Sequence, residues 1–416
     1  MATDTPVETA IETAPRVQSL GDGIREQWDR IRGGEVGALP VLVGIALIVA
    51  FFEFKNTKFL SPGNFVDLIT QLAGPTIIAM GVVFVLLLGE IDLSAGLISG
   101  VGGVGMAELL LASHGDWTGT WWAGLLGIAL AIIVGLAVGI FQGAFVAYVG
   151  VPSFVVTLAG FLTLQGVLLR IIGEGGTVGI QNDTIFKAAN AYVNHRIAWI
   201  VAIAGTVLLV GAMAWRYAGR IRNGLPVGAP VLYFGKAAAM GLAVLGVTWY
   251  CNSSDQGLPV SGLIVAGLLI GLTFLVERTR FGRHIVAVGG SEEAARRSGI
   301  PTKRIKVYCF MIASALAGLG GVILASRLNS VSPDSGGGTL LLEVIAAAVI
   351  GGTSLFGGRG RVISALLGSI VIYGVENGID LLAYDAAYKY IVTGLILLAA
   401  VTVDTLSRKR LAKTGR

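Results

Sequence analysis

The polar stretch from residue 289 to residue 301 has the residue types and spacing that point most directly to a function. Its acids precede its bases, so each charge lies at the end of the helix dipole that it stabilises. Ser291 can accept an orphan backbone N–H as an N-cap, Gly299 supplies a left-handed C′ position, and Pro301 prevents continuation. The stretch therefore predicts one short helix with both ends marked, formed by Ser291, Glu292, Glu293, Ala294, Ala295, Arg296, Arg297 and Gly299.

A helix of two turns is marginal alone in water. Two interpretations follow for this short helix: it docks onto another protein, or it is a solvated linker.

Two glycine-rich segments, Gly89–Gly96 and Gly351–Gly358, each follow one apolar run and begin another. They can be aligned glycine to glycine, which indicates an internal repeat, with chance similarity as the alternative. Glycine permits tight turns and close helix approach. Non-helical backbone at membrane depth survives only where protein or a water-filled path surrounds it, and transporters built from repeats place such breaks near the substrate route.

One hypothesis is therefore that the two turns support or line a solute path, with polar partners from Asp92, Ser94, Thr353 and Ser354. The alternative is that Glu90 and Asp92 cap a span at the cytoplasmic surface.

Motifs for catalysis, nucleotide binding or metal binding are missing. The sequence has no G-x-x-x-x-G-K-[ST] and no G-x-S-x-G, so it has neither a P-loop nor a nucleophile elbow. Its two cysteines lie in apolar segments and its three histidines in different connections, so we expect no metal site, no catalytic residue and no cofactor in this chain.

Composition indicates which elements position these segments. The chain has 416 residues, of which 54% are hydrophobic and 13% are charged, against roughly 25% charged in soluble domains. A cytosolic enzyme, a nucleic-acid binder and a secreted disulfide scaffold are thereby disfavoured. An all-α polytopic membrane protein is predicted, with about twelve transmembrane helices near residues 37–54, 65–88, 93–113, 122–148, 153–173, 197–215, 234–251, 259–277, 307–327, 340–356, 362–379 and 387–404.

Charge sets the expected orientation. Most of the 30 Lys and Arg residues fall in connections on one side of these spans, including the loop 278–306, which places both termini in the cytoplasm. Ten spans fit if two short runs turn back within the membrane. We expect residues 1–36 to form a cytoplasmic tail with an amphipathic helix, residues 37–404 the membrane domain, and residues 405–416 a basic cytoplasmic tail.

Four motifs in order resemble those of ABC-importer permeases. Glu293-Ala294-Ala295 with Gly299 resembles the EAA-type coupling loop of that family. The flank Phe281–Ile285 and the stretches Glu90–Gly96, Val151–Gly160 and Ile350–Gly358 are similar to its sugar branch of ribose, xylose and arabinose permeases, and most of all to xylose-type members. This chain has an extension at residues of about 200–256 that shorter ribose-type members lack, and xylose-type members look similarly extended. The likeness covers about residues 65–404.

The resemblance implies a type II-like permease that moves a monosaccharide by alternating access. It also implies the partners: a second permease copy, a cytoplasmic ATPase that carries ATP and Mg²⁺, and an extracytoplasmic sugar-binding protein. The bacterial inner membrane is the expected location. A branched-chain amino-acid permease, a secondary sugar carrier and a membrane scaffold are the alternatives.

Overall fold

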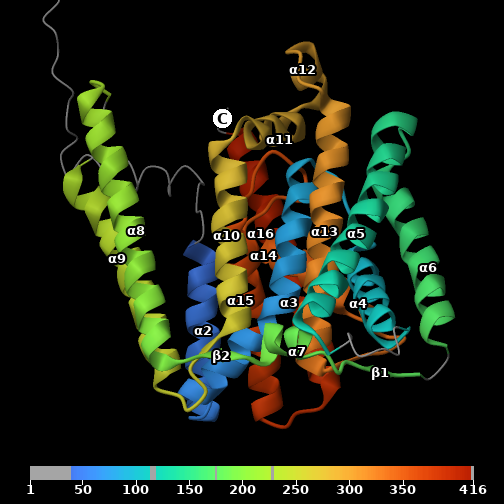
Figure 1. The fold of residues 1–416 in the computed structure, drawn as a ribbon. Coiled ribbons are helices and arrows are strands. Elements are labelled where there is room, and N and C mark those ends of the chain that lie inside the picture. Colours follow the sequence, from blue (N-terminus) through green and yellow to red (C-terminus); the bar gives the residue numbers. More distant parts are fainter. Residues whose placement is uncertain (1–38, 113–118, 174–175, 226–228, 414–416) are drawn as a thin grey trace, which may run out of the picture. The chain divides into compact units, whose positions relative to one another are not determined.

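The computed structural model describes residues 39–112, 119–173, 176–225 and 229–413. All twelve apolar runs correspond to helices (Figure 1): α2 (Leu39–Lys55), α3 (Pro62–Leu87), α4 (Ala95–Ala112), α5 (Trp121–Ala144), α6 (Ser153–Ile172), α8 (His195–Arg222), α9 (Pro230–Asn252), α10 (Val260–Arg278), α13 (Thr302–Leu328), α14 (Leu340–Ile350), α15 (Ile363–Leu381) and α16 (Ala386–Lys413). Seven helices of the described chain are long and apolar enough to cross a membrane, and α4, α14 and α16 contribute shorter apolar segments. The prediction of a polytopic helical protein is confirmed. The tail of residues 1–36 lies outside the described residues.

The connections carry the remaining elements. These are the π-helical turn η1 (Phe145–Val149), helices α7 (Asp183–Asn190), α11 (Arg280–Gly290) and α12 (Glu292–Arg297), and four two-residue strands. Strand β1 (Val178–Gly179) pairs antiparallel with β4 (Ser330–Val331), and β2 (Tyr192–Val193) pairs antiparallel with β3 (Leu258–Pro259). The helices α11 and α12 lie at one end of their unit, and α7 and β1 lie at the other (Figure 1).

The chain divides into two compact units, which are described separately. Residues 194–253 contribute the hairpin of α8 and α9 to one, and residues 37–193 with 254–416 form the other. In the hairpin, the rings of Tyr217, Tyr233 and Phe234 pack together near the tip. The hairpin accounts for the extension that the sequence places near residues 200–256.

The core of the larger unit is built on α3 and α13. Most of α3 is buried, and α13 packs against α3, α4 and α5. Glycines allow this close approach: a Cβ on Gly139 of α5 would lie 2.8 Å from the Cα of Met311, and one on Gly318 of α13 would collide with the carbonyl oxygen of Ala131. Apolar spans therefore meet backbone to backbone, as small residues allow in membrane proteins.

The helix α14 is shorter than the apolar run predicts. It ends at Ile350 instead of residue 356, because Gly352, Gly357 and Gly358 have positive φ values of 106°, 81° and 72°, which a helix does not accommodate. At about 1.5 Å per residue, its 11 residues are too few to cross a hydrocarbon core of about 30 Å.

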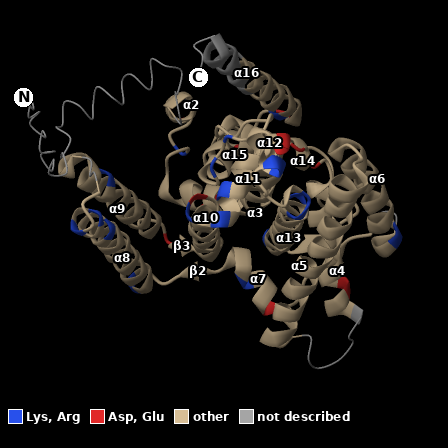
Figure 2. Ribbon diagram, turned by 90° about the horizontal axis from the view of Figure 1, so that it is seen from above, with Lys and Arg blue, Asp and Glu red and all other residues tan. Residues whose placement is uncertain are grey.

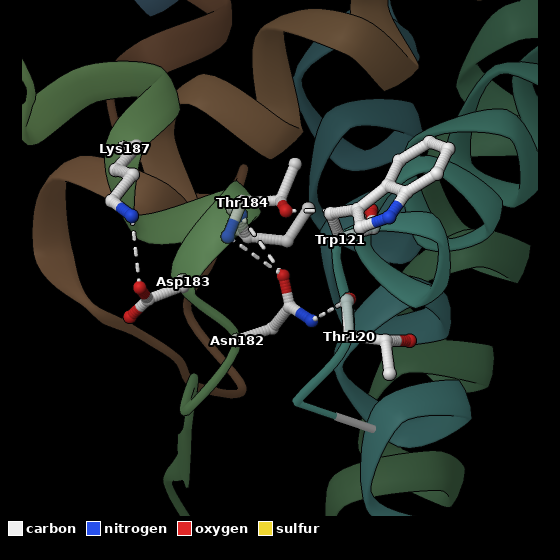
Figure 3. Close-up of polar contacts among 7 residues, drawn as sticks. Thr120, Trp121, Asn182, Asp183, Thr184 and Lys187 are labelled. Carbon is white, nitrogen blue, oxygen red and sulfur yellow. Dashed lines mark hydrogen bonds and ion pairs between the residues drawn. The ribbon is translucent and has the colours of Figure 1, made fainter. Parts of the chain in front are cut away.

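Helix α7 was not predicted, and polar contacts attach it to the start of α5 (Figure 3). The Asn182 Oδ1 accepts the backbone N–H groups of Thr184 at 2.9 Å and Ile185 at 3.2 Å, which caps α7, while its Nδ2 donates to the carbonyl oxygen of Thr120 at 3.0 Å. On its other side, the backbone N–H of Ala189 donates to Ser326 Oγ of α13 at 2.9 Å. This end of the unit is thus closed by an eight-residue helix bonded to two long ones.

Candidate functional site

The connection between α10 and α13 folds as two short helices. Thr279 caps α11, because its hydroxyl accepts the backbone N–H of Gly282 at 3.2 Å. The buried side of α11 presents Ile285 and Val288, whereas Arg283 is exposed. Lys and Arg gather around α10, α11 and α12 in the view onto this end (Figure 2). With charged residues on one face and apolar residues on the other, α11 lies across this end of the bundle with its apolar face buried.

Helix α12 has the caps that the sequence predicts. Ser291 Oγ accepts the backbone N–H of Ala294 at 3.3 Å, and Gly299 adopts a φ of 79°. The N–H of Ile300 donates to the carbonyl oxygen of Ala295 at 3.1 Å, which completes a Schellman motif. Glu293 pairs with both Arg296 at 2.7 Å and Arg297 at 3.0 Å. From Glu292 to Gly299 only Ala295 is buried, so the helix projects as an exposed, internally fixed element.

Lys306 connects α12 to the first glycine turn. Its Nζ lies 2.8 Å from Glu292 Oε2 and 2.8 Å from Glu90 Oε1, and its side chain is only 12% exposed. The shared ammonium group of Lys306 therefore ties Glu292, the first residue of α12, to Glu90 in the turn between α3 and α4. The sequence analysis did not identify this bridge, although an ionisable residue in the first turns of a span is itself a signal of function.

Backbone contacts join the first glycine turn to α11 and to the second glycine turn. The N–H of Gly358 donates to the carbonyl oxygen of Leu87 at 2.9 Å, and a Cβ on Gly289 would collide with both of these atoms. A Cβ on Gly357 would lie 2.7 Å from the backbone nitrogen of Gly89. We call this meeting of α3, α11 and the 351–360 connection, through Leu87, Gly89, Gly289, Gly357 and Gly358, the glycine junction. Only residues without a side chain allow it.

The two glycine turns meet, but they do not share a backbone conformation. Gly89 has a φ of 78° whereas its aligned counterpart Gly351 has a φ of −67°, and Gly96 is helical whereas Gly358 has a φ of 72°. The interpretation as an internal repeat is therefore not supported at these positions. Close packing of two unrelated turns explains their glycines instead.

Asp92 and Ser94 are buried in the first turn. Asp92 Oδ1 accepts the N–H of Ser94 at 2.8 Å and its hydroxyl at 2.6 Å, and Gln142 Nε2 of α5 donates to Ser94 Oγ at 2.9 Å. The other carboxylate oxygen, Oδ2, is buried without a hydrogen bond to any described residue. Burial raises the pKa of Asp92 above its usual value of 3.8, and hydrogen bonds from Ser94 and Ala95 oppose that rise.

Helix α6 holds the same turn through the Val151–Gly160 motif. The N–H of Ile91 donates to Ser153 Oγ at 3.1 Å, and Thr157 Oγ1 lies 3.3 Å from the Ile91 carbonyl oxygen. Hydroxyls four residues apart lie on one helix face, so α6 binds both backbone groups of one residue in the turn.

Thr353 and Ser354 are also buried, in the second turn. The N–H of Ser354 donates to the Arg359 carbonyl oxygen at 3.0 Å, and its Oγ accepts the N–H of Phe356 at 3.3 Å. All four residues named as candidates for a path are thus buried in the two glycine turns. Their role in a solute path remains a prediction.

These features define a class: a multi-pass inner-membrane protein whose helical bundle presents a capped, exposed helix that is bonded to its interior turns. A sequence model of the family "Branched-chain amino acid transport system / permease component" matches residues 64–401, and the chain belongs to this family. It is therefore a transport permease rather than an enzyme.

Individual relatives agree with the resemblance seen in the motifs. The Escherichia coli K12 xylose transport system permease protein XylH is 38% identical over 89% of this chain and 93% of its own length. The D-allose permease AlsC of the same strain is 30% identical over 88% and 90%, and its ribose import permease RbsC is 29% identical over 87% and 92%. No solved structure matches the chain.

Proposed function

We propose that this chain is the membrane-spanning permease subunit of an ATP-driven ABC importer for a monosaccharide, a pentose such as xylose. The structural observation that carries the proposal is α12, whose ends are capped and whose residues, apart from Ala295, are exposed. A helix of this kind is suited to fit a groove of a cytoplasmic ATPase. Xylose is proposed because permeases named for xylose, at 38% and 37% identity, share most of their length with this chain.

The proposed coupling runs through residues that this chain supplies. Ser291, Glu292, Glu293, Ala294, Ala295, Arg296, Arg297 and Gly299 form the surface for the ATPase. Lys306 and the glycine junction pass its movement to α3 and α4. ATP and Mg²⁺ belong to the ATPase, and this chain performs no bond chemistry. Alternating access then opens the bundle toward one side of the membrane at a time.

The remaining partners follow from the same proposal. The unit works as a homodimer with two ATPases, with both termini in the cytoplasm. A sugar-binding protein docks at the outer end, which carries α7, β1 and β4. The excess of Lys and Arg at the α11–α12 end supports this orientation, because cytoplasmic loops are enriched in these residues.

Reconstitution tests the proposal. The permease, its ATPase and its binding protein are placed in liposomes, and uptake of radiolabelled D-xylose is measured with and without ATP. We expect uptake that requires ATP and all three components. Uptake driven by an ion gradient in the isolated chain would instead indicate a secondary carrier and would overturn the proposal.

The docking role has a separate test in the same vesicles. Glu293→Lys breaks both ion pairs within α12 and cancels the negative charge of its first turn, because Glu292 remains. We expect weaker ATPase binding and slower uptake with unchanged membrane insertion. Lys236→Glu, a charge reversal at an exposed position of α9, is the matched control and should transport normally.

A branched-chain amino-acid permease is the second candidate, since the family description names that substrate. L-Leucine uptake in the same vesicles distinguishes the two. Transport of leucine with no transport of D-xylose would replace the sugar by an amino acid and leave the coupling argument intact.

A further inference from the structure

A pocket of about 390 Å³ opens in the larger unit, away from the coupling loop. It lies among α3, α4, α13, α14 and α15, and residues 330–337 form part of its wall. Along α13 it is lined from Gly321 to Leu328, whereas Lys306 belongs to the opposite end of that helix. Those ends are separated by about 30 Å at 1.5 Å per residue. The pocket thus extends from the outer end toward the middle of the bundle.

The deep part of the pocket is polar. Glu343 of α14 is 9% exposed, and its carboxylate accepts hydrogen bonds from the hydroxyls of Tyr373, at 2.8 Å, and Thr339. Glu376, one turn beyond Tyr373 on α15, lines the same pocket as Glu343. Acidic side chains within a membrane bundle are expensive to bury and usually serve a function. No other feature of the proposed mechanism uses this pair.

Backbone and small side chains form the facing wall. A Cβ on Gly100 of α4 would collide with the carbonyl oxygen of Ser335, and one on Gly336 would lie 2.6 Å from the backbone nitrogen of Gly100. The 335–337 loop is therefore seated directly on α4. Because α4 begins at the turn that Lys306 binds through Glu90, one helix connects the coupling end to the pocket wall.

The mixture of groups suits a neutral polyol. Carboxylates accept hydrogen bonds, the Arg327 guanidinium donates them, and the Gln71 amide does both, which matches hydroxyl groups that each donate and accept. A pocket of this volume lies within the range of roughly 300–1,000 Å³ typical of small-molecule sites. A cation site is less well supported, because the described residues hold no group of three or more His, Cys, Asp or Glu side chains that could bind a metal.

We propose that this pocket binds the transported monosaccharide, with Glu376 and the Tyr373-supported Glu343 accepting hydrogen bonds from its hydroxyls. The proposal rests on the function proposed above and adds the place of binding. It places the residues that contact the sugar on α14 and α15. Sugar delivered at the outer end would reach Arg327 and Asp334 first, since these two lining residues are exposed.

Uptake and ATP hydrolysis in the same vesicles test the proposal. Glu376→Gln replaces one carboxyl oxygen by an amide nitrogen but keeps the shape, and we expect D-xylose uptake to fall about tenfold or more, as for a buried hydrogen bond that loses one partner. ATP hydrolysis stimulated by the binding protein should persist. Glu108→Gln, a half-buried carboxylate of α4 outside the lining residues, is the matched control and should transport normally.

A second variant does not depend on the tolerance of Glu376 to substitution. Asp334→Cys, at the exposed rim, is purified in folded form and then reacted with a bulky maleimide; the two native cysteines are buried. We expect modification to abolish D-xylose uptake, whereas Lys236→Cys, at an exposed position of α9 outside the lining residues, keeps it after the same modification.

The results separate the two proposals. If the unmodified complex imports no sugar, the proposed function fails. If it imports D-xylose and both Glu376→Gln and the modified Asp334→Cys transport like the unaltered chain, the sugar passes elsewhere and the pocket proposal is overturned. Leucine transport that is blocked by the same two changes would also overturn it, because the pocket would then hold an amino acid.

Discussion

Replacing Lys306 by methionine should uncouple ATP hydrolysis from transport. The change removes the ammonium group that lies 2.8 Å from both Glu90 and Glu292, while the methionine side chain retains the apolar stem. Glu90 belongs to the turn that starts α4, and Glu292 starts α12. Without the shared cation, the carboxylates of Glu292 on α12 and Glu90 in the turn remain close to each other, and no group binds both.

The exposures of the three groups set the size of the effect. The side chain of Lys306 is 12% exposed and that of Glu90 is 18% exposed, whereas Glu292 is 50% exposed. Removing one partner of a buried ion pair costs about 3–5 kcal/mol, and exposed pairs contribute about 0.2–1 kcal/mol. With one well-buried and one half-exposed contact, we expect about 1–3 kcal/mol. If the whole of this lost interaction free energy weakens the coupling between α12 and α4, the amount of sugar taken up per ATP falls about fivefold to a hundredfold.

The assay measures D-xylose uptake and ATP hydrolysis in one preparation of vesicles. Lys306→Met should lower the ratio of the two, and Lys306→Arg should lower it less because the charge remains. Lys303→Met is the control: Lys303 is exposed in the same turn, and its Nζ lies 5.5 Å from the centroid of the Tyr148 ring instead of beside Glu90 and Glu292. A double-mutant cycle with Glu90→Gln should be non-additive. Wild-type uptake per ATP in Lys306→Met would refute the reasoning.

Three further changes test other parts of the end of the unit that carries α11, α12 and the glycine turns. Gly289→Ala should destabilise the protein by about 1–3 kcal/mol, because the added Cβ overpacks against Leu87. Gly290→Ala is the control, since a Cβ there meets no atom within 4 Å. Equal melting temperatures for the two variants would contradict the glycine junction. Gly299→Pro cannot adopt a φ of 79° and removes the N–H that closes α12, so ATPase affinity should fall while membrane insertion is unchanged; unaltered affinity would argue against docking. Asp92→Asn should flatten the pH dependence of the melting temperature. Burial raises the pKa of Asp92, so the folded state retains its proton longer than the unfolded state and stability falls as pH rises from about 3.8 toward the folded pKa; an unchanged pH profile would show that Asp92 ionises equally in both states.

Local patterns were predictable from the sequence, and the structure shows why. The caps of α12 depend on contacts between residues three to five positions apart, so Ser291, Gly299 and the order of charges were sufficient to define its ends. The twelve apolar runs became helices because backbone groups in lipid must be satisfied within the segment. In α14 the apolar side chains of Leu355 and Phe356 extended the prediction beyond the helix, whereas the glycines that flank them decided its end.

Two short helices were missed although both had local signals. Asn182 before Asp183, with Lys187 four residues later, is a capped helix start with an ion pair. The spacing of Ile285 and Val288 in α11 is that of one helix face. Each segment is short and polar, so the search for long apolar runs passed over it.

Long-range contacts could not be predicted in the same way. Glu90 and Lys306 are far apart in the chain, and no periodicity relates them; the same holds for Leu87, Gly289 and Gly358 at the glycine junction. The grouping of Glu343, Tyr373 and Glu376 arises partly from helical spacing on α15 and partly from the packing of α14 against it. Glu343 and Glu376 fall within the predicted spans 340–356 and 362–379, but only the fold brings them to one pocket.

The arrangement of α4 explains how events at the two ends of the unit could be linked. Its first turn is held by Ser153 and Thr157 of α6 and, through Glu90, by Lys306, and its glycine face carries the 335–337 loop at the pocket. A packed backbone contact transmits displacement because interiors are dense and have low compressibility. Movement of α12 by an ATPase would therefore shift the wall that faces Glu376, and a sugar held between the two would be bound in one position of α4 and released in the other. Coupling of this kind requires no residue of the chain to touch ATP, in agreement with the absence of a P-loop from its sequence.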